Sequence, residues 1–410
     1  MVTRACAAIV LLAVIAVHGQ SSTSTTETWV TTAAEGQTSS ATAMAGSTTG
    51  YDWGSTATPQ QPSTPQTVGK LGCGCNHSSL WLDIMLVLDS SSAMTGGGLQ
   101  ELQNYIGTAV LRMAIGQQTG QMSRIGIITY SDKATLRAPL TMFNSSDNFV
   151  DGIFGVPFEN LGGSNIEAGI QLAVAEFEKN GQGSFANRKK VIVLAASHYE
   201  PGGSVDPKQT AATFRLNGEY VQTHGATVPV LSELASNCSQ LTNRNEDLRA
   251  DDLLDKFCLA NCFCATNWNP YSMDSQCYTP DQGCYFPVTI PSAFVLAQRY
   301  CHNRNGATLP TVCDADKANY MASQLKNAKE AQWTGLQNVG GNFQWDDGTS
   351  YASCQPGINP SWVNGTATSG QPVAQVTISG FRQGFFGAPS FNDYLYTCQN
   401  APCSSTLYCA

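Results

Sequence analysis

Cysteine is the residue type with the most evident chemistry in this sequence, which holds 15 cysteines among 410 residues. Two Cys-x-Cys pairs, at 73 and 75 and at 262 and 264, offer four sulfurs that zinc could use. Their spacing is tighter than that of the usual zinc knuckle, and cysteines of secreted chains commonly form disulfides. We therefore expect disulfides, and the fourteen cysteines that follow Cys6 are even in number.

Histidine, serine and glycine patterns give no sign of catalysis. Four histidines follow position 19, and none lies in a metal-hydrolase helix motif. The sequence contains no Gly-x-Ser-x-Gly elbow, and Gly96-Gly97-Gly98 lacks the Lys-Ser/Thr of a phosphate-binding loop. We therefore expect a protein that is not an enzyme.

The first seventy residues have the composition of a targeting segment followed by a spacer. Residues 5–17 are apolar and the small Gly19 suits cleavage, so residues 1–19 are expected to be a secretory signal peptide. Residues 20–70 are rich in Ser, Thr, Gly and Pro, which predicts a disordered stalk, either O-glycosylated or unmodified. No run of eighteen apolar residues follows, so we expect a secreted, extracellular chain without a transmembrane segment.

The net charge and the glycosylation motifs are also consistent with a secreted protein. The formal charge of −9, with only 21 lysines and arginines, argues against nucleic acid as a partner. Four Asn-x-Ser/Thr motifs are expected to accept N-linked glycans in a secreted chain. These motifs begin at Asn76, Asn144, Asn237 and Asn364.

Apolar strands alternate with amphipathic helices between residues 78 and 262. The apolar runs that predict buried strands lie at 80–88, 124–130 and 190–195. Apolar residues at helical spacing from Ile166 to Phe177 predict a helix, and Ser164 with Glu167 predicts its capping box. Another helix is expected after Asp206-Pro207. The alternation predicts a doubly wound α/β domain with a mostly parallel sheet.

This segment resembles a von Willebrand factor type A domain, which we expect to span residues 73–262. The resemblance rests on the strand that ends in Asp89-Ser90-Ser91, on Gly162-Gly163-Ser164-Asn165 at a helix start, and on the strand at 190–195. Domains of this family hold Mg²⁺ or Mn²⁺ at the carboxyl ends of their strands, using two Asp side chains and three hydroxyls.

The resemblance places only part of that metal site in this chain. Asp89, Ser91 and Ser164 match three ligand positions. The second hydroxyl falls on Ala93, and the second Asp falls on Ser197. Because Mg²⁺ dehydrates reluctantly, losing a carboxylate and a hydroxyl should weaken binding greatly. We expect a vestigial site, with Ca²⁺ and Mg²⁺ disfavoured as cofactors.

Residues 265–410 resemble a C-type lectin-like domain, which has an α+β fold. The landmarks are a helix at 292–301, Ala307-Thr308-Leu309-Pro310, Trp333-Thr334-Gly335-Leu336, Trp345-Asp346-Asp347-Gly348 and Tyr396-Thr397-Cys398. In the order of these two domains, the chain is similar to a family of secreted nematode proteins.

Disulfide pairings follow from these resemblances. The lectin-like family implies a bridge between Cys301 and Cys398. In the first domain, disulfides that join its two ends are expected, and the four cysteines concerned would pair among themselves. Those four are Cys73, Cys75, Cys262 and Cys264.

Sugar-binding lectins of this family hold Ca²⁺ with a Glu-Pro-Asn or Gln-Pro-Asp loop and a Trp-Asn-Asp strand. Here Ile358 stands where an acidic or amide ligand is expected, and Phe391-Asn392-Asp393 lies too close to Cys398. We therefore expect any sugar to bind without calcium. A metal-free site needs an aromatic platform with amides beside it, for which Asn359 and Trp362 are the candidates. The alternative is that Trp362 only packs its loop onto the domain.

These resemblances imply a secreted, lectin-like recognition or adhesion protein that contacts glycans or extracellular proteins, with a role in innate defence. The alternative is a structural extracellular or surface-coat protein whose modules adhere to other proteins and bind no glycan.

Overall fold

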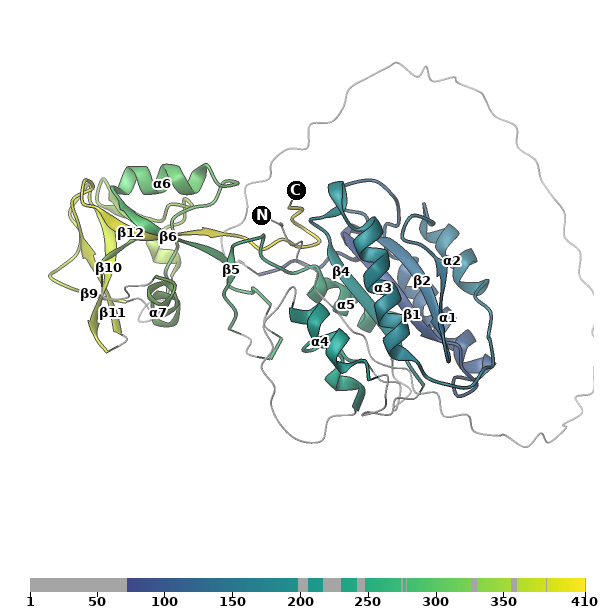
Figure 1. The fold of residues 1–410 in the computed structure, drawn as a ribbon. Coiled ribbons are helices and arrows are strands. Elements are labelled where there is room, and N and C mark those ends of the chain that lie inside the picture. Colours follow the sequence, from purple (N-terminus) through teal and green to yellow (C-terminus); the bar gives the residue numbers. More distant parts are fainter. Residues whose placement is uncertain are drawn as a thin grey trace, which may run out of the picture. The chain divides into compact units, whose positions relative to one another are not determined.

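The computed structural model describes residues 72–197, 206–216, 230–241, 248–273, 276–277, 279–325, 330–354, 360–380 and 382–409. The expected signal peptide at 1–19 and the expected stalk at 20–70 lie outside these residues. Two sheets, each formed by its own stretch of sequence, organise the described chain (Figure 1). No helix within the described ranges combines the length and the apolar character that crossing a bilayer requires.

The first sheet has four strands in the order β3-β2-β1-β4. Its three parallel strands are β1 (Leu82–Asp89), β2 (Arg124–Tyr130) and β4 (Lys189–Ala195). Every residue of these strands is buried, as expected where helices cover both faces of a parallel sheet. The edge strand β3 (Ala134–Ala138) pairs antiparallel with β2. The three predicted strands are therefore present, within two residues of their expected limits.

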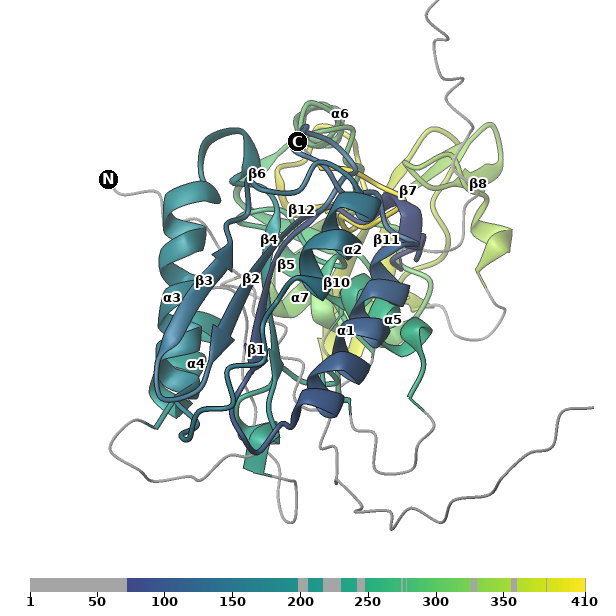
Figure 2. The same cartoon turned by 90° about the vertical axis from the view of Figure 1, so that its right-hand side faces the viewer.

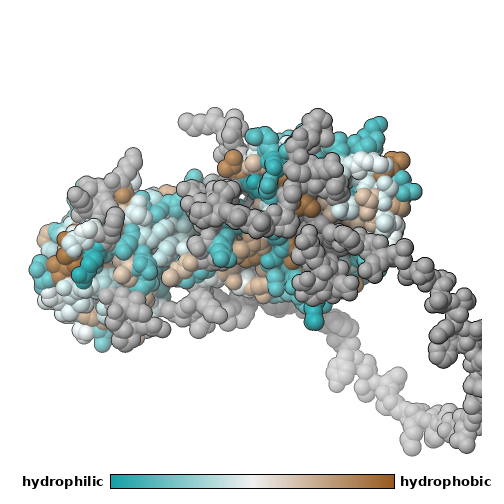
Figure 3. Space-filling view, turned by 90° about the horizontal axis from the view of Figure 1, so that it is seen from below, coloured by the Kyte–Doolittle hydropathy of each residue, from teal (hydrophilic) through white to brown (hydrophobic). Residues whose placement is uncertain are grey.

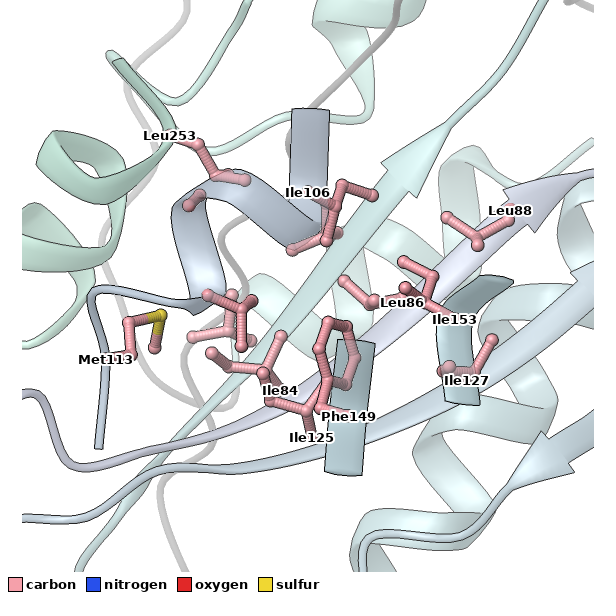
Figure 4. Close-up of a cluster of buried hydrophobic side chains, with 14 of the residues drawn as sticks. Ile84, Leu86, Leu88, Ile106, Met113, Ile125, Ile127, Phe149, Ile153 and Leu253 are labelled. Atoms are coloured by element: carbon pink, nitrogen blue, oxygen red, sulfur yellow. The ribbon is translucent and has the colours of Figure 1, made fainter. Parts of the chain in front are cut away.

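Helices cover both faces of this sheet (Figure 2). One face carries α1 (Gly96–Val110), α2 (Ser146–Phe154) and α5 (Ala250–Ala260). The other carries α3 (Ile166–Asn180) and α4 (Lys208–Leu216). On the first face, β1, β2 and the three helices interlock aliphatic and aromatic side chains such as Ile84, Ile106 and Phe149 (Figure 4). The predicted doubly wound α/β domain is thus confirmed.

The start of α3 differs from the predicted capping box. Asn165, not Ser164, is the N-cap, and its side-chain oxygen accepts a hydrogen bond from the Ala168 amide. The Asn165 amide donates to the Ser131 carbonyl oxygen at 2.7 Å. This bond to the loop after β2 fixes Asn165 as the last residue before the first turn, so its side chain rather than that of Ser164 caps the helix.

The second sheet has eight strands, seven of them in the order β5-β6-β12-β7-β10-β11-β9, with β8 paired to β7. Its strands are β5 (Asn269–Pro270), β6 (Cys284–Ser292), β7 (Gln332–Val339), β8 (Asn342–Gln344), β9 (Ser361–Trp362), β10 (Pro372–Ser379), β11 (Arg382–Gly387) and β12 (Tyr394–Asn400). Two helices, α6 (Phe294–His302) and α7 (Ala315–Ser323), pack against it. The landmark segment at 307–310 is no regular strand and makes only an isolated bridge, between Thr308 and Gln399.

Four short 3₁₀ helices complete the described secondary structure. They are η1 (His77–Ser79), η2 (Gly183–Phe185), η3 (Val230–Glu233) and η4 (Tyr351–Ser353).

Seven disulfides join all fourteen cysteines after Cys6, including Cys301 to Cys398. The predicted pairing of the four Cys-x-Cys cysteines among themselves is wrong in part. The structure joins Cys73 to Cys262. Cys75 is bonded instead to Cys258, and Cys264 to Cys284.

The spacing of the cysteines explains this pairing. Cys258 lies in α5 and Cys262 follows four residues later, just past the helix end. Four residues of helix rise about 6 Å, and two residues of extended chain span about 6.6 Å. Cys73 and Cys75 can therefore reach Cys262 and Cys258 together, which leaves Cys264 for Cys284 at the start of β6.

The C-terminal segment 403–409 packs against the start of the first domain. Trp81 is fully buried, and its indole N–H donates to the Ser404 carbonyl oxygen at 2.8 Å. The Trp81 ring contacts those of Phe263 and Tyr408, at centroid distances of 5.3 and 4.7 Å. These rings and the Cys403–Cys409 disulfide form a small hydrophobic cluster separate from the two sheet cores.

Candidate functional site

The carboxyl ends of β1, β2 and β4 bring together several of the predicted metal-site residues. Asp89, the last residue of β1, is fully buried. Its Oδ1 accepts from the Ser91 amide at 2.8 Å, and its Oδ2 accepts from the amide of Ser197 at 3.0 Å and from the Ser197 hydroxyl. Both carboxylate oxygens are therefore held by donors of the protein itself, two of them from the residue that replaces the family's second Asp.

The two hydroxyl residues that match the metal site, Ser91 and Ser164, differ in their burial. Ser91 Oγ is buried and has no hydrogen-bond partner among the described residues. Ser164 is half-buried in the loop before α3, and Ala93 is exposed on the loop after β1. Among the described residues that match the metal site, Ser91 is thus the one whose hydroxyl oxygen is buried and has no hydrogen-bond partner.

A second carboxylate at this edge, Glu159, is already neutralised. It forms an ion pair with Arg137 of β3. Its Oε2 also accepts from the Ser90 and Ser131 hydroxyls, at 3.0 and 3.3 Å. Sequence reasoning missed Glu159, because nothing in its spacing ties a loop residue to a strand that lies some twenty positions earlier.

Electrostatics at this edge reflect one buried negative charge. Burial raises the pKa of the Tyr130 hydroxyl well above its ordinary value, and the nearby Asp89 carboxylate adds to the rise. Tyr130 therefore stays neutral, and its hydroxyl donates to the Ala195 carbonyl oxygen at 3.2 Å. This hydroxyl thus has a structural role at the edge of the sheet.

These residues do not fit the divalent metal that the fold family implies. A hard cation such as Mg²⁺ needs about six oxygens in a rigid octahedron. Here Asp89 is engaged by three protein donors, Glu159 is paired with Arg137, and Ala93 offers no oxygen. Ser91 Oγ alone cannot assemble such a site.

A zinc site made of the Cys-x-Cys sulfurs is also incompatible with the structure. The described residues contain one group of three or more His, Cys, Asp or Glu side chains with ligand atoms within 4.8 Å, namely Cys75, His77 and Cys258. Cys75 and Cys258 are bonded to each other, so neither supplies the thiolate that zinc requires.

The candidate ligand loop of the second domain is only partly described, because Asn359 lies outside the described residues. Trp362 is in β9 and is half-buried, which favours the alternative that it packs its loop onto the domain. Its ring packs against Phe343 and Phe385, at centroid distances of 5.4 and 5.9 Å. Parallel pairing of β9 with β11 places Trp362 beside Phe385, and the Trp362 ring packs against the core of the domain.

Neighbouring groups support this packing role for Trp362. The side chain of Tyr351 is hydrogen-bonded to that of Trp362, and burial raises the pKa of the tyrosine hydroxyl despite that bond.

In the segment before β12, the Asn392 side chain donates to the Tyr394 hydroxyl at 2.8 Å. This bond engages the Asn392 nitrogen within the domain, as is common for a turn residue.

The four acceptor asparagines lie in different settings. All four residues, Asn76, Asn144, Asn237 and Asn364, are exposed. Asn76 caps η1 and accepts from the Ser78 amide and hydroxyl, at 3.2 and 2.9 Å. In the motif at Asn237, the middle residue is bonded to Cys277 and Ser239 is buried. Asn364 sits at a loop tip with a φ of 61°.

Family profiles match both parts of the chain. The von Willebrand factor type A domain matches residues 83–247, and the Lectin C-type domain matches residues 291–375. This protein joins a von Willebrand factor type A domain to a C-type lectin domain. Neither of these domains is a known enzyme family, and both are typical of extracellular proteins.

A curated relative has the lectin family in its name. C-type lectin domain-containing protein 160 of Caenorhabditis elegans is 28% identical over 288 residues, which cover 66% of this chain. The match spans only 43% of that relative's length. The von Willebrand factor A–lectin chain therefore corresponds to less than half of the nematode protein.

Solved structures with similar folds include proximal thread matrix protein 1 from the mussel byssus. A form of it with a zinc-occupied MIDAS motif is 19% identical, with a TM-score of 0.37, over 45% of this chain and 48% of that chain. Human lithostathine is 20% identical, with a TM-score of 0.27, over 35% of this chain and 93% of that chain. Likeness at this level adds nothing about ligands.

Proposed function

We propose that the chain is a secreted, lectin-like adhesion protein that recognises glycans or extracellular proteins without a divalent metal. The absence of a divalent metal from this proposal rests on the hydrogen bonds of Asp89, whose two carboxylate oxygens accept from Ser91 and Ser197. Secretion is supported by the seven disulfides, since disulfides form and persist in oxidising compartments. A role in innate defence belongs to the same proposal.

The proposed organisation follows the motifs and the folds together. A signal peptide at 1–19 and a stalk at 20–70 would precede a von Willebrand factor A domain at 73–262 and a lectin domain at 265–410. N-linked glycans at the exposed Asn144 and Asn364 would be compatible with both domains. We propose that the chain performs no catalysis and acts by contact alone.

The metal-free proposal predicts that divalent ions leave the thermal stability of the full chain unchanged. A ligand that binds the native state stabilises it by mass action, by about 2.7 kcal/mol at a hundredfold excess over Kd. We expect millimolar Mg²⁺, Mn²⁺ or Ca²⁺ to shift Tm by less than about 1 °C relative to chelator, measured by differential scanning calorimetry.

Two variants interpret any shift that does appear. Asp89→Ala removes the buried carboxylate at the edge of the first sheet, and Asp393→Ala removes an exposed carboxylate of the lectin domain. A metal-dependent rise of several degrees that either variant abolishes would overturn the proposal. A rise that survives both would point to nonspecific binding to the acidic surface.

A further inference from the structure

The lectin domain carries a cluster of four exposed apolar side chains, which we name the α6 patch. It consists of Ile290, Val295, Leu296 and Phe391, with exposed fractions of 73, 63, 58 and 78%. Single exposed apolar residues are ordinary on protein surfaces, whereas large apolar patches with polar rims mark interaction sites. By contrast, brown residues on the face drawn in Figure 3 lie in small separate groups among teal and white ones.

Three segments bring these side chains together around the start of α6. An irregularity in the pairing of β6 with β12 falls opposite residues 289–291, so Ile290 projects from the sheet instead of joining its ladder. The Phe294 amide, in the first turn of α6, donates to the Ser390 carbonyl oxygen at 2.9 Å. Phe391, the next residue, is therefore held beside the same helix end.

The helix places its two apolar residues on the outward face. Phe294, Ala297 and Cys301 are the buried residues of α6, at the spacing of one helix face. Val295 and Leu296 are exposed and lie on the opposite face of the helix. Figure 1 shows α6 lying alongside the sheet. Burial against the domain's own core cannot explain them, because that core already uses the other side of the helix.

Charges at the rim of the α6 patch have both signs. Arg299 lies four residues after Val295 on the same outward face, and Asp393 lies two residues after Phe391. Both side chains are exposed, and neither forms an ion pair with a described residue. His302, the last residue of α6, already contacts the Asp346 carboxylate at 3.1 Å.

From this arrangement we infer that the α6 patch binds a second copy of the chain. In a two-fold interface each patch faces itself, which allows Arg299 of one copy to pair with Asp393 of the other, and any such pair is made twice. The apolar centre would supply a few hundred Å², less than the ~800 Å² per partner of a stable interface, so the dimer is reversible. Lipid is a poorer fit, since an anionic rim residue and a net charge of −9 disfavour an anionic membrane.

Self-association would have a direct consequence for adhesion. Pairing two lectin domains makes the second binding event intramolecular, which raises avidity without any new contact to the ligand. This inference goes beyond the proposed recognition function and does not depend on it, since a chain that binds no glycan could still dimerise through the α6 patch.

Sedimentation equilibrium of the full chain over a range of concentrations tests the inference. We expect the average mass to rise from that of one chain toward that of two as concentration increases. Phe391→Glu should weaken association at least tenfold, because it replaces an apolar side chain of the patch by a charge. The matched control is Leu216→Glu, in α4, where the replaced side chain is 67% exposed but lies outside the patch.

Charge reversal separates a second copy from other occupants. Arg299→Asp and Asp393→Arg should each weaken association, whereas the chain that carries both changes should regain it. A chain that stays monomeric at every concentration overturns the inference, even if it binds a different protein or lipid vesicles. Equal effects of Phe391→Glu and Leu216→Glu would overturn it as well, and circular dichroism verifies that each variant is folded.

Discussion

Replacing Cys301 and Cys398 together by serine should destabilise the lectin domain by roughly 4–5 kcal/mol, because the disulfide restricts the conformational freedom of the unfolded chain. The bridge joins residues 97 positions apart and lies fully buried between α6 and β12. Because two domains unfold in one chain, the measurement is hydrogen exchange of β7 and β10 peptides as denaturant increases.

A second disulfide of the same region provides the control. Cys264 and Cys284 close a loop of only 20 positions, so their double replacement should cost about 3 kcal/mol by the same loop-closure entropy. The larger loss for the Cys301–Cys398 pair is the expected order. A loss below about 1 kcal/mol for that pair, or the reverse order, would contradict the view that this bridge closes the domain.

Restoring the two missing ligands should create a metal site in the von Willebrand factor A domain. The change is Ala93→Ser combined with Ser197→Asp, which returns a hydroxyl and a carboxylate to the carboxyl edge of the sheet. Without metal, the new carboxylate would lie beside Asp89 Oδ2, where Ser197 now donates, so two like charges would repel. We expect a lower Tm in chelator and a rise of several degrees with millimolar Mg²⁺.

Two matched chains interpret the result. Asp89→Ala in the doubly substituted chain should abolish the response to Mg²⁺, because it removes the carboxylate that the family shares. Ala93→Ser alone should give no response, because the second carboxylate is still lacking. If the doubly substituted chain ignores Mg²⁺ yet folds, the missing ligands are not what prevents binding, and the ion pair of Glu159 with Arg137 becomes the next element to change.

The sequence predicts the strands of the first domain well, because fully buried parallel strands leave long apolar runs. The run at 124–130 coincides with β2, and the helix from Ile166 to Phe177 is α3 with one more turn at its end. What it could not decide was which of two adjacent polar residues caps α3, since Ser164 and Asn165 both suit that role. A contact from the loop after β2 settles it.

Part of the disulfide pairing and the burial of the ligand loop were not predicted from local sequence pattern. Cys258 and Cys262 are four apart near a helix end, and Cys73 and Cys75 are two apart in irregular chain, so the match in length was readable from the sequence. The two Cys-x-Cys motifs instead led to the prediction that Cys264, and not Cys258, bonds to one of the other three cysteines of these motifs. Trp362 could not be placed from sequence, because its burial depends on Phe343 and Phe385, which come from other strands.

Carbohydrate recognition without metal is tested most directly by an array of glycans and extracellular-matrix proteins, probed with the full chain in Ca²⁺ and in chelator. We predict the same set of bound ligands in both conditions, with signals that agree within about twofold. Asp89→Ala and Asp393→Ala should leave those signals unchanged. Binding that appears only with Ca²⁺ and is lost in either variant would contradict the account, and signals for matrix proteins alone would favour the structural alternative.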